Sequence, residues 1–131
     1  MRLHHVGIAV ASLRRAEERY LALGYRRKAL GEVPAQGVRV LWLESDAGGA
    51  ALELLEPTGE ETPVGRFLAR RGEGLHHLAF AVPDLEAALS RYRAEGLPLV
   101  DREPRVGFGG HRVAFLHPRA FFGVLVELVE E

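Results

Sequence analysis

The sequence contains no cysteine, and several other residue types are nearly absent. Without thiols, disulfide bonds and cysteine-based catalysis are both excluded. Asparagine is missing, Gln36 is the only glutamine, and Lys28 is the only lysine beside sixteen arginines. Depletion of thermolabile amides is typical of heat-adapted proteins and predicts a thermophilic source. A GC-rich genome would produce the same bias and explains it equally well.

Long apolar runs and an excess of charge are missing as well. No hydrophobic stretch approaches the roughly 20 residues that a membrane-spanning helix needs, and the net charge is −1. These facts argue against a membrane protein and against a nucleic-acid-binding protein. The chain starts with a strand-like segment rather than a separate signal segment. We therefore expect a single cytoplasmic domain, whose 131 residues and 47% hydrophobic content allow a real core.

An internal repeat is the most informative feature of the sequence. Residues 3–25 and 75–97 align without a gap, and 11 of these 23 positions are identical, which chance does not explain. A looser similarity continues in two further pairs of segments, 38–44 with 111–117 and 50–57 with 123–130. The chain therefore predicts two copies of one structural unit.

Each copy has the pattern of one strand, one helix and about three further strands. Its first eight or so residues are rich in Val, Ile, Leu and Phe, which favours a strand. Ser12 and Asp84 follow as helix caps, and Gly24 and Gly96 are suited to end the two helices. The later segments of each copy are predicted as hairpin strands. Each copy is thus a βαβββ module.

The two modules are predicted to cover residues 1–58 and 75–131 of one domain. Within the connector, 59–74, Thr62 is suited to cap a helix and Pro63 to occupy its first position. Three apolar residues then give one hydrophobic face. We therefore expect a connecting helix rather than a flexible linker.

Four titratable side chains occupy equivalent places in the two copies. His5 corresponds to His77, 72 residues later, and Glu53 corresponds to Glu127, 74 residues later. A pseudo-twofold axis would bring the two imidazoles and two carboxylates together. This set balances a divalent cation and leaves coordination positions open, which suits a borderline or hard metal. The predicted fold class is therefore α+β, with two repeated βαβββ modules forming a curved mixed sheet around a metal site.

Adjacent histidines in each copy require a choice of ligand. Side chains alternate between the two faces of a strand. His5 and His77 share their faces with glycine and alanine, which leave room for a cavity. His4 and His76 share theirs with larger apolar residues and are expected to pack or to support the ligands. A single strand histidine is usually structural, and a strand glutamate could face solvent. The equivalence of all four positions is what favours a metal site.

Several motifs give the chain a family resemblance over residues 3–130. They are HVGIAV (5–10), QGV (36–38), ELLEP (53–57), GEGLHHLAF (72–80), FLHP (115–118) and GVLVEL (123–128). With them the chain resembles the vicinal oxygen chelate superfamily, which includes glyoxalase I, extradiol dioxygenases and antibiotic-resistance proteins. The segments GEGLHH, FLHP and GVLVEL are similar to the methylmalonyl-CoA epimerase branch in particular.

The resemblance implies a ligand set, a cofactor and partners. By position, the metal ligands of the family fall on His5, Glu53, His77 and Glu127. The family also implies a homodimer, an acyl-CoA substrate and one divalent ion. That ion is most often Co2+, with Mn2+, Ni2+, Zn2+ or Mg2+ as alternatives.

The implied reaction interconverts (R)- and (S)-methylmalonyl-CoA by removing and returning the alpha proton through a metal-stabilised enolate. Two acid/base groups should flank the reacting carbon. Glu127 is the expected first group. Some family members carry a glutamate two residues after the QGV motif, where Val40 stands here. Glu44, on the same strand face, is predicted as the second group, with Glu32 in the preceding loop as another candidate.

Further candidates lie in loops. Residues 103–112 resemble the glycine-rich substrate loop of the family, although an ordinary hairpin loop would have the same composition. Nearby arginines could meet the phosphates of CoA. Gln36 and His117 are candidates to line the cavity or support the ligands.

Three other functions remain open from the sequence. A glyoxalase I-like lactoylglutathione lyase would use the same four ligands, but that branch usually has a D-P-x-G stretch before its last glutamate strand. This chain has HPRAFFGVLVEL there instead. A non-catalytic small-molecule-binding protein of the superfamily would generally lack the carboxylate ligands. An extradiol dioxygenase would have a non-ligand residue at one of the four positions.

Overall fold

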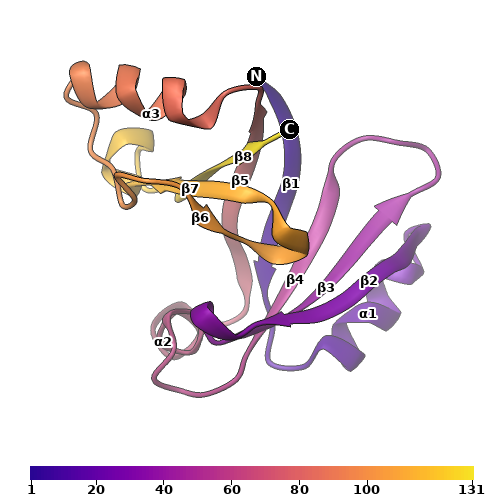
Figure 1. Cartoon of the computed structure of the whole chain (residues 1–131). Helices are drawn as coiled ribbons and strands as arrows, with labels where there is room; N and C mark the ends of the chain where they lie inside the picture. The colour runs from indigo at the N-terminus through magenta and orange to yellow at the C-terminus, as the bar shows by residue number, and fades with distance from the viewer. The chain divides into compact units, whose positions relative to one another are not determined.

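The computed structural model describes residues 1–131 and confirms the α+β class (Figure 1). Elements follow in the order β1 (Arg2–Ala9), α1 (Leu13–Leu21), β2 (Tyr25–Val33), η1 (Pro34–Gln36), β3 (Val38–Ser45), β4 (Ala51–Pro57), α2 (Pro63–Arg71), β5 (Gly74–Val82), α3 (Leu85–Ala94), β6 (Arg105–Val106), η2 (Phe108–Gly110), β7 (Arg112–Leu116), η3 (Pro118–Phe121) and β8 (Val126–Glu130). This order gives a strand, a helix and three strands on each side of α2. None of the helices is long and apolar enough to cross a membrane.

The chain forms two compact units, and these do not coincide with the repeat. The amino-terminal unit is Val6–His76, and the carboxyl-terminal unit joins Met1–His5 to His77–Glu131. Strand β1 therefore contributes to both units. The module boundaries at 58 and 75 remain a prediction drawn from the repeat.

In the amino-terminal unit, the strands follow the order β2-β3-β4-β1 (Figure 1). The pairs β2–β3 and β3–β4 are antiparallel. Leu41 and Leu43 of β3 are fully buried in one core cluster with Leu13 of α1. Because strand side chains alternate, Val40 and Trp42 belong to the opposite face of the sheet.

Local signals fix the helices of this unit. The Ser12 side chain accepts a hydrogen bond from the backbone N–H of Arg15, as predicted for the cap of α1. Thr62 accepts from the N–H of Gly65 and caps α2, with Pro63 in the first turn. Both caps and the connecting helix were expected from the sequence and are confirmed.

In the carboxyl-terminal unit, β5, β8, β7 and β6 follow one another beside β1 (Figure 1). The β5–β8 pair is parallel, whereas β7–β8 and β6–β7 are antiparallel. Helix α3 buries Leu85 and Leu89 against Leu116 and Leu128 in one core cluster. Asp84 caps this helix by accepting from the N–H of Ala87, which confirms the second predicted cap.

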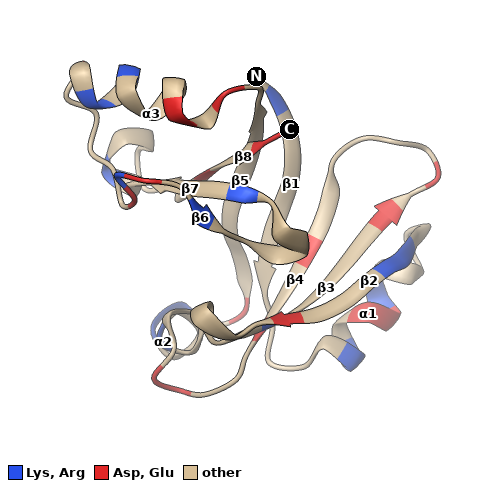
Figure 2. Cartoon of the chain, in the orientation of Figure 1, with Lys and Arg blue, Asp and Glu red and all other residues tan.

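Charges along α3 match the helix dipole. Glu86 lies in the first turn, and Arg91 and Arg93 lie in the last, a separation that Figure 2 shows along the helix. Acidic groups are stabilising near helix N-termini and basic groups near C-termini. In addition, Glu130 Oε2 accepts a hydrogen bond from the N–H of Leu85 at 2.9 Å, which ties the start of α3 to the end of β8.

The second strand of the second module is much shorter than its counterpart in the first. Strand β6 contains only Arg105 and Val106, whereas β2 has nine residues. The chain ahead of β6 pairs instead through a single bridge between Leu99 and Leu116. The N–H groups of Val100 and Asp101 both donate to the carbonyl of Phe115.

Candidate metal centre

Three of the four predicted ligands lie together inside the carboxyl-terminal unit. His5 is on β1, His77 on β5 and Glu127 on β8, and their exposed fractions are only 3%, 4% and 6%. The parallel β5–β8 register sets Ala79, two residues after His77, opposite Glu127. Ala79 is fully buried, so the small side chain fills little of the space beside the carboxylate. This burial agrees with the expected orientation of His5 and His77, and their role as ligands stays a prediction.

The three donor atoms converge. Nε2 of His5 lies 3.2 Å from Nε2 of His77 and 2.9 Å from Oε1 of Glu127. Nε2 of His77 lies 3.4 Å from the same Oε1. Donors about 2.1 Å from one divalent ion are separated by about 3.0 Å in octahedral and about 3.4 Å in tetrahedral geometry. Two imidazole nitrogens and one carboxylate oxygen at these separations could hold a metal ion.

Aromatic residues accompany the carboxylates. Phe115 of β7 pairs with Glu127 in the strand register, and its ring meets the His77 ring edge-on with centroids 5.7 Å apart. The Arg105 guanidinium lies over the Phe115 ring, 5.3 Å from its centroid. Phe115 therefore limits how the His77 ring can rotate. Sequence reasoning did not identify it, although the repeat contained the signal, because Phe115 is the equivalent of Trp42.

The fourth predicted ligand, Glu53, lies on β4 of the amino-terminal unit. Its exposed fraction is 8%, and apolar leucines flank it on both sides in the strand. Its partner across the β3–β4 register is Trp42, so Glu53 belongs to the sheet face opposite the α1 core. Each predicted carboxylate ligand thus has an aromatic residue opposite it on the neighbouring strand.

His4 contacts the second nitrogen of a ligand. Its Nδ1 lies 2.8 Å from Nδ1 of His5, and its Nε2 lies 3.3 Å from Oε2 of Glu131. Burial lowers the pKa of His4 below the ordinary 6.5, the neighbouring His5, Arg2 and His111 lower it further, and Glu127 raises it. The net effect favours the neutral imidazole, in keeping with the expected supporting role.

The remaining predicted site residues are less enclosed. Glu44 is exposed, and its carboxylate accepts a hydrogen bond from Trp42 Nε1 at 2.9 Å and lies 4.0 Å from Lys28 Nζ. Gln36 ends the short η1 helix and is half-buried. His117 is exposed, and its Nδ1 accepts from the N–H of Arg119 at 3.0 Å, so this ring caps η3.

The glycine-rich loop 103–112 contains η2 and the turn of the β6–β7 hairpin. Gly109 and Gly110 both have positive φ, 75° and 81°, which favours glycine at these positions. Two of the nearby arginines are engaged with carboxylates: Arg105 pairs with Asp101, and Arg112 pairs with Glu86 and Glu130.

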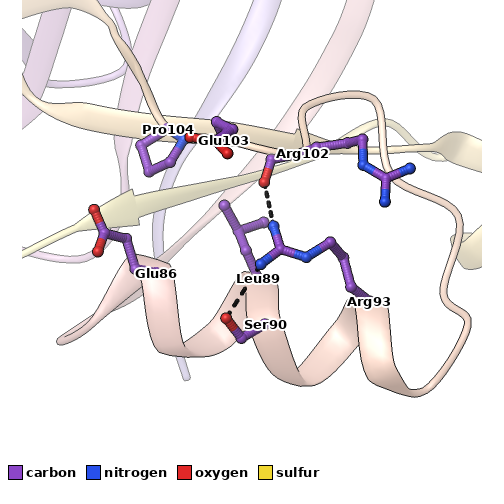
Figure 3. Close-up of a pocket in the computed structure, with 7 residues that line it drawn as sticks. All are labelled: Glu86, Leu89, Ser90, Arg93, Arg102, Glu103 and Pro104. Carbon is purple, nitrogen blue, oxygen red and sulfur yellow. Dashed lines mark hydrogen bonds between the residues drawn. The ribbon is translucent and has the colours of Figure 1, made fainter.

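A pocket of about 230 Å3 lies between α3 and the segment 102–104 (Figure 3), and none of the four predicted ligands lines it. The Arg93 guanidinium donates to the carbonyl of Arg102 and to Ser90 Oγ. Because protein groups already occupy this guanidinium, the pocket offers little to an anionic ligand. Its lining consists of Glu86, Leu89, Ser90, Arg93, Arg102, Glu103 and Pro104.

The fold and the buried His–His–Glu group agree with one family. The model of the Glyoxalase/Bleomycin resistance protein/Dioxygenase superfamily matches residues 4–115. The chain belongs to this superfamily.

Similar proteins within the superfamily include named epimerases. The ethylmalonyl-CoA/methylmalonyl-CoA epimerase of Cereibacter sphaeroides is 38% identical over 97% of this chain and 96% of its own. The crystal structure of methylmalonyl-CoA epimerase from Mycobacterium tuberculosis has 39% identity and a TM-score of 0.94, covering 98% of this chain and 87% of that one. A variant of the Streptomyces coelicolor methylmalonyl-CoA epimerase, in complex with 2-nitronate-propionyl-CoA, has 40% identity and a TM-score of 0.92, covering 100% and 97%.

Proposed function

We propose that this protein is a metal-dependent epimerase that interconverts (R)- and (S)-methylmalonyl-CoA. The observation that carries the proposal is the buried group of His5, His77 and Glu127, whose donor atoms lie 2.9 to 3.4 Å apart. Nearly full-length identity of 38–40% to epimerases of this name supports the same substrate class.

In this proposal His5, His77, Glu127 and Glu53 hold one divalent ion. Glu53 joins the set because it is the repeat equivalent of Glu127 and is almost equally buried. When bound, the ion would polarise the thioester carbonyl and stabilise negative charge on its oxygen. The two imidazoles ligate in their neutral form, so the two carboxylates balance the charge of the ion.

Glu127 has two roles in the proposed reaction. Its Oε1 is turned towards both imidazoles, and we assign proton exchange to Oε2. As the C–H bond breaks, its electron pair delocalises into the thioester and the proton passes to the carboxylate. Return of a proton to the opposite face of the carbon inverts its configuration. The low exposure of Glu127 limits competition from water for this proton.

Glu44 remains the proposed second acid/base group. It lies on the Glu53 face of β3, two residues beyond Trp42, and Val40 on that face carries no titratable group. The proposal requires the Glu44 carboxylate to exchange its Trp42 hydrogen bond for the substrate. General acid–base groups typically contribute about 10²–10⁴-fold to a rate, so Glu44→Gln is expected to lower kcat by that order.

The direct test is proton exchange in D2O. Metal-stripped protein would be mixed with (R)- or (S)-methylmalonyl-CoA, and the alpha proton followed by NMR while Co2+, Mn2+, Ni2+, Zn2+ or Mg2+ is added. The proposal expects metal-dependent deuterium uptake with loss of stereochemical purity. Glu44→Gln would slow this exchange, and Glu32→Gln tests the other candidate for the same role. Ethylmalonyl-CoA, taken from the name of the Cereibacter relative, would test the acyl group.

If the alpha proton did not exchange with any of the ions although a metal bound tightly, the epimerase function would be refuted. The assignment of the metal centre would not be affected. Methylglyoxal–thiol adducts would then test the lyase reaction. Equal exchange rates for Glu44→Gln and the unchanged protein would remove Glu44 from the mechanism.

Three finer points belong to the same proposal. Co2+ is the expected native ion, and the metal series above would rank it against the others. A homodimer is expected and is checked by light scattering. A cytoplasmic location is expected from the sequence and is checked by cell fractionation.

A further inference from the structure

The His5 ring meets other side chains at both of its nitrogens, and the two contacts are chemically coupled. Nε2 lies at the proposed metal centre, while Nδ1 lies 2.8 Å from Nδ1 of His4. A neutral imidazole carries one proton, so one nitrogen donates a hydrogen bond and the other offers a lone pair. The His4 contact therefore bears on whether Nε2 can bind a metal at all.

Two tautomer arrangements of this chain of groups are possible, and a cation at His5 distinguishes between them. In the first, His5 donates from Nδ1 to Nδ1 of His4, and His4 donates from Nε2 to Oε2 of Glu131, 3.3 Å away. His5 Nε2 then keeps its lone pair, which faces Glu127 Oε1 at 2.9 Å, and a cation bound between these two acceptors removes their repulsion. In the second, His4 donates from Nδ1 to His5, and His5 donates from Nε2 to Glu127 Oε1, so no lone pair is left for a metal. The lone pair of His4 Nε2 then faces the carboxylate of Glu131, and these two acceptors oppose each other with or without a cation at His5.

Glu131 thus favours the first arrangement, in which His4 donates to it, and Arg2 holds the Glu131 carboxylate in place. The Arg2 guanidinium pairs with the other oxygen, Oε1, of the same carboxylate. The His4 side chain is 11% exposed and that of Glu131 is 47% exposed, so water screens the carboxylate but hardly reaches the imidazole. The side chains thus contact one another in the order Arg2, Glu131, His4 and His5, and all four residues belong to the carboxyl-terminal unit.

We propose that His4 and Glu131 are positioning residues, which hold the His5 imidazole in the tautomer that presents the Nε2 lone pair to a divalent cation. This inference rests on His5 being a ligand in the proposed function, but it does not depend on the acyl-CoA. Ligand histidines commonly donate their second ring N–H to a supporting acceptor, and loss of that acceptor costs about 10–100-fold in metal affinity. Here the acceptor is a second histidine, oriented by a carboxylate at its far side.

His4→Phe keeps a planar ring but removes the acceptor, whereas His4→Asn keeps an acceptor near the position of Nδ1. The dissociation constant for Mn2+ would be measured by chelator competition. We expect His4→Phe to raise it about 10–100-fold and His4→Asn to restore most of the affinity. His111→Phe is the matched control, because His111 meets His4 only edge-on at a centroid distance of 6.1 Å. Its affinity should be unchanged.

A second readout concerns the metal-free protein. Long-range 1H–15N NMR identifies the tautomer of His5, and we expect the Nδ1–H form to lose population in His4→Phe and in Glu131→Ala. Glu131→Ala alters only a half-exposed end of the chain, so it provides a folded variant if His4→Phe does not fold.

Unchanged affinity in His4→Phe, or an unchanged His5 tautomer in both variants, would overturn the inference. If the unchanged protein bound no divalent ion, the proposed function would fail, and the tautomer in metal-free protein would still decide the role of His4.

Discussion

Replacing His77 with alanine is the sharpest test of the metal centre. The imidazole is 2% exposed, and its Nε2 lies within 3.4 Å of both His5 Nε2 and Glu127 Oε1. His77→Ala deletes one of the three donor atoms within this unit and also removes the ring that packs on Phe115. The variant therefore loses stability even without metal, and the comparison has to separate that loss from the loss of binding.

The expected magnitude follows from linkage. An ion at 100 times its dissociation constant stabilises the folded protein by about 2.7 kcal/mol. For small domains 1 kcal/mol changes Tm by about 2–8 °C, so the unchanged protein should gain on the order of 10 °C. If His77→Ala weakens binding about 100-fold, the same concentration equals the new dissociation constant, and only about 0.4 kcal/mol remains.

The assay is thermal unfolding of each protein with and without Co2+, so that the metal-free cost of each variant cancels. His117→Ala is the control, since His117 is exposed and its Nδ1 is used to cap η3. Its Tm gain should match that of the unchanged protein. A full gain in His77→Ala, together with one bound ion per chain by elemental analysis, would refute the ligand assignment.

Two further predictions concern stability. Gly65→Ala should destabilise the protein by about 1–3 kcal/mol in urea unfolding, because the new Cβ would lie 2.3 Å from the carbonyl oxygen of Gly59. In a helix without such a contact, alanine is more stable than glycine by about 1 kcal/mol. A stabilised Gly65→Ala variant would therefore contradict this packing. The Arg27 guanidinium donates two hydrogen bonds to Glu17 and holds the pKa of that carboxyl below the ordinary 4.5. Because the folded pKa is depressed, this pair stabilises the fold above pH 4.5, and the stabilisation disappears as pH falls through the folded pKa. In Glu17→Gln, the free energy of unfolding should therefore fall less on acidification than in the unchanged protein. An equal fall in both proteins would show that the pair does not contribute to acid stability.

Features set by local chemistry were predictable from the sequence. Ser12, Thr62 and Asp84 cap their helices as expected, because a cap depends on one side chain and a backbone N–H three residues away. The burial of His5 and His77 also followed from alternation along a strand whose other positions on that face are small.

Strand β2 could not be located because its residues lack a period of two. All its central positions from Arg26 to Leu30 are exposed, and Lys28 falls where the register with β3 shifts. Charged residues and a bulge are typical of a strand at the edge of a sheet. Because the central side chains of β2 are exposed on both of its faces, burial imposes no alternation on its sequence.

The contacts that the supporting groups of the site make were beyond sequence reasoning, although the repeat marks Phe115 and strand alternation marks His4. The contact between Phe115 and the His77 ring depends on the β7–β8 register, and the contact between His4 and Glu131 joins the two ends of the chain. Neither motif nor periodicity specifies such long-range pairs.

The joining of Met1–His5 to His77–Glu131 in one compact unit has a consequence for biosynthesis. His5 of β1 is synthesised well before Glu127 of β8. Their contact closes the long loop between these two strands, so it forms only after β8 has been made. A nascent chain that has not yet reached β8 lacks this carboxylate. The complete donor group of His5, His77 and Glu127 therefore exists only in chains whose synthesis has passed β8.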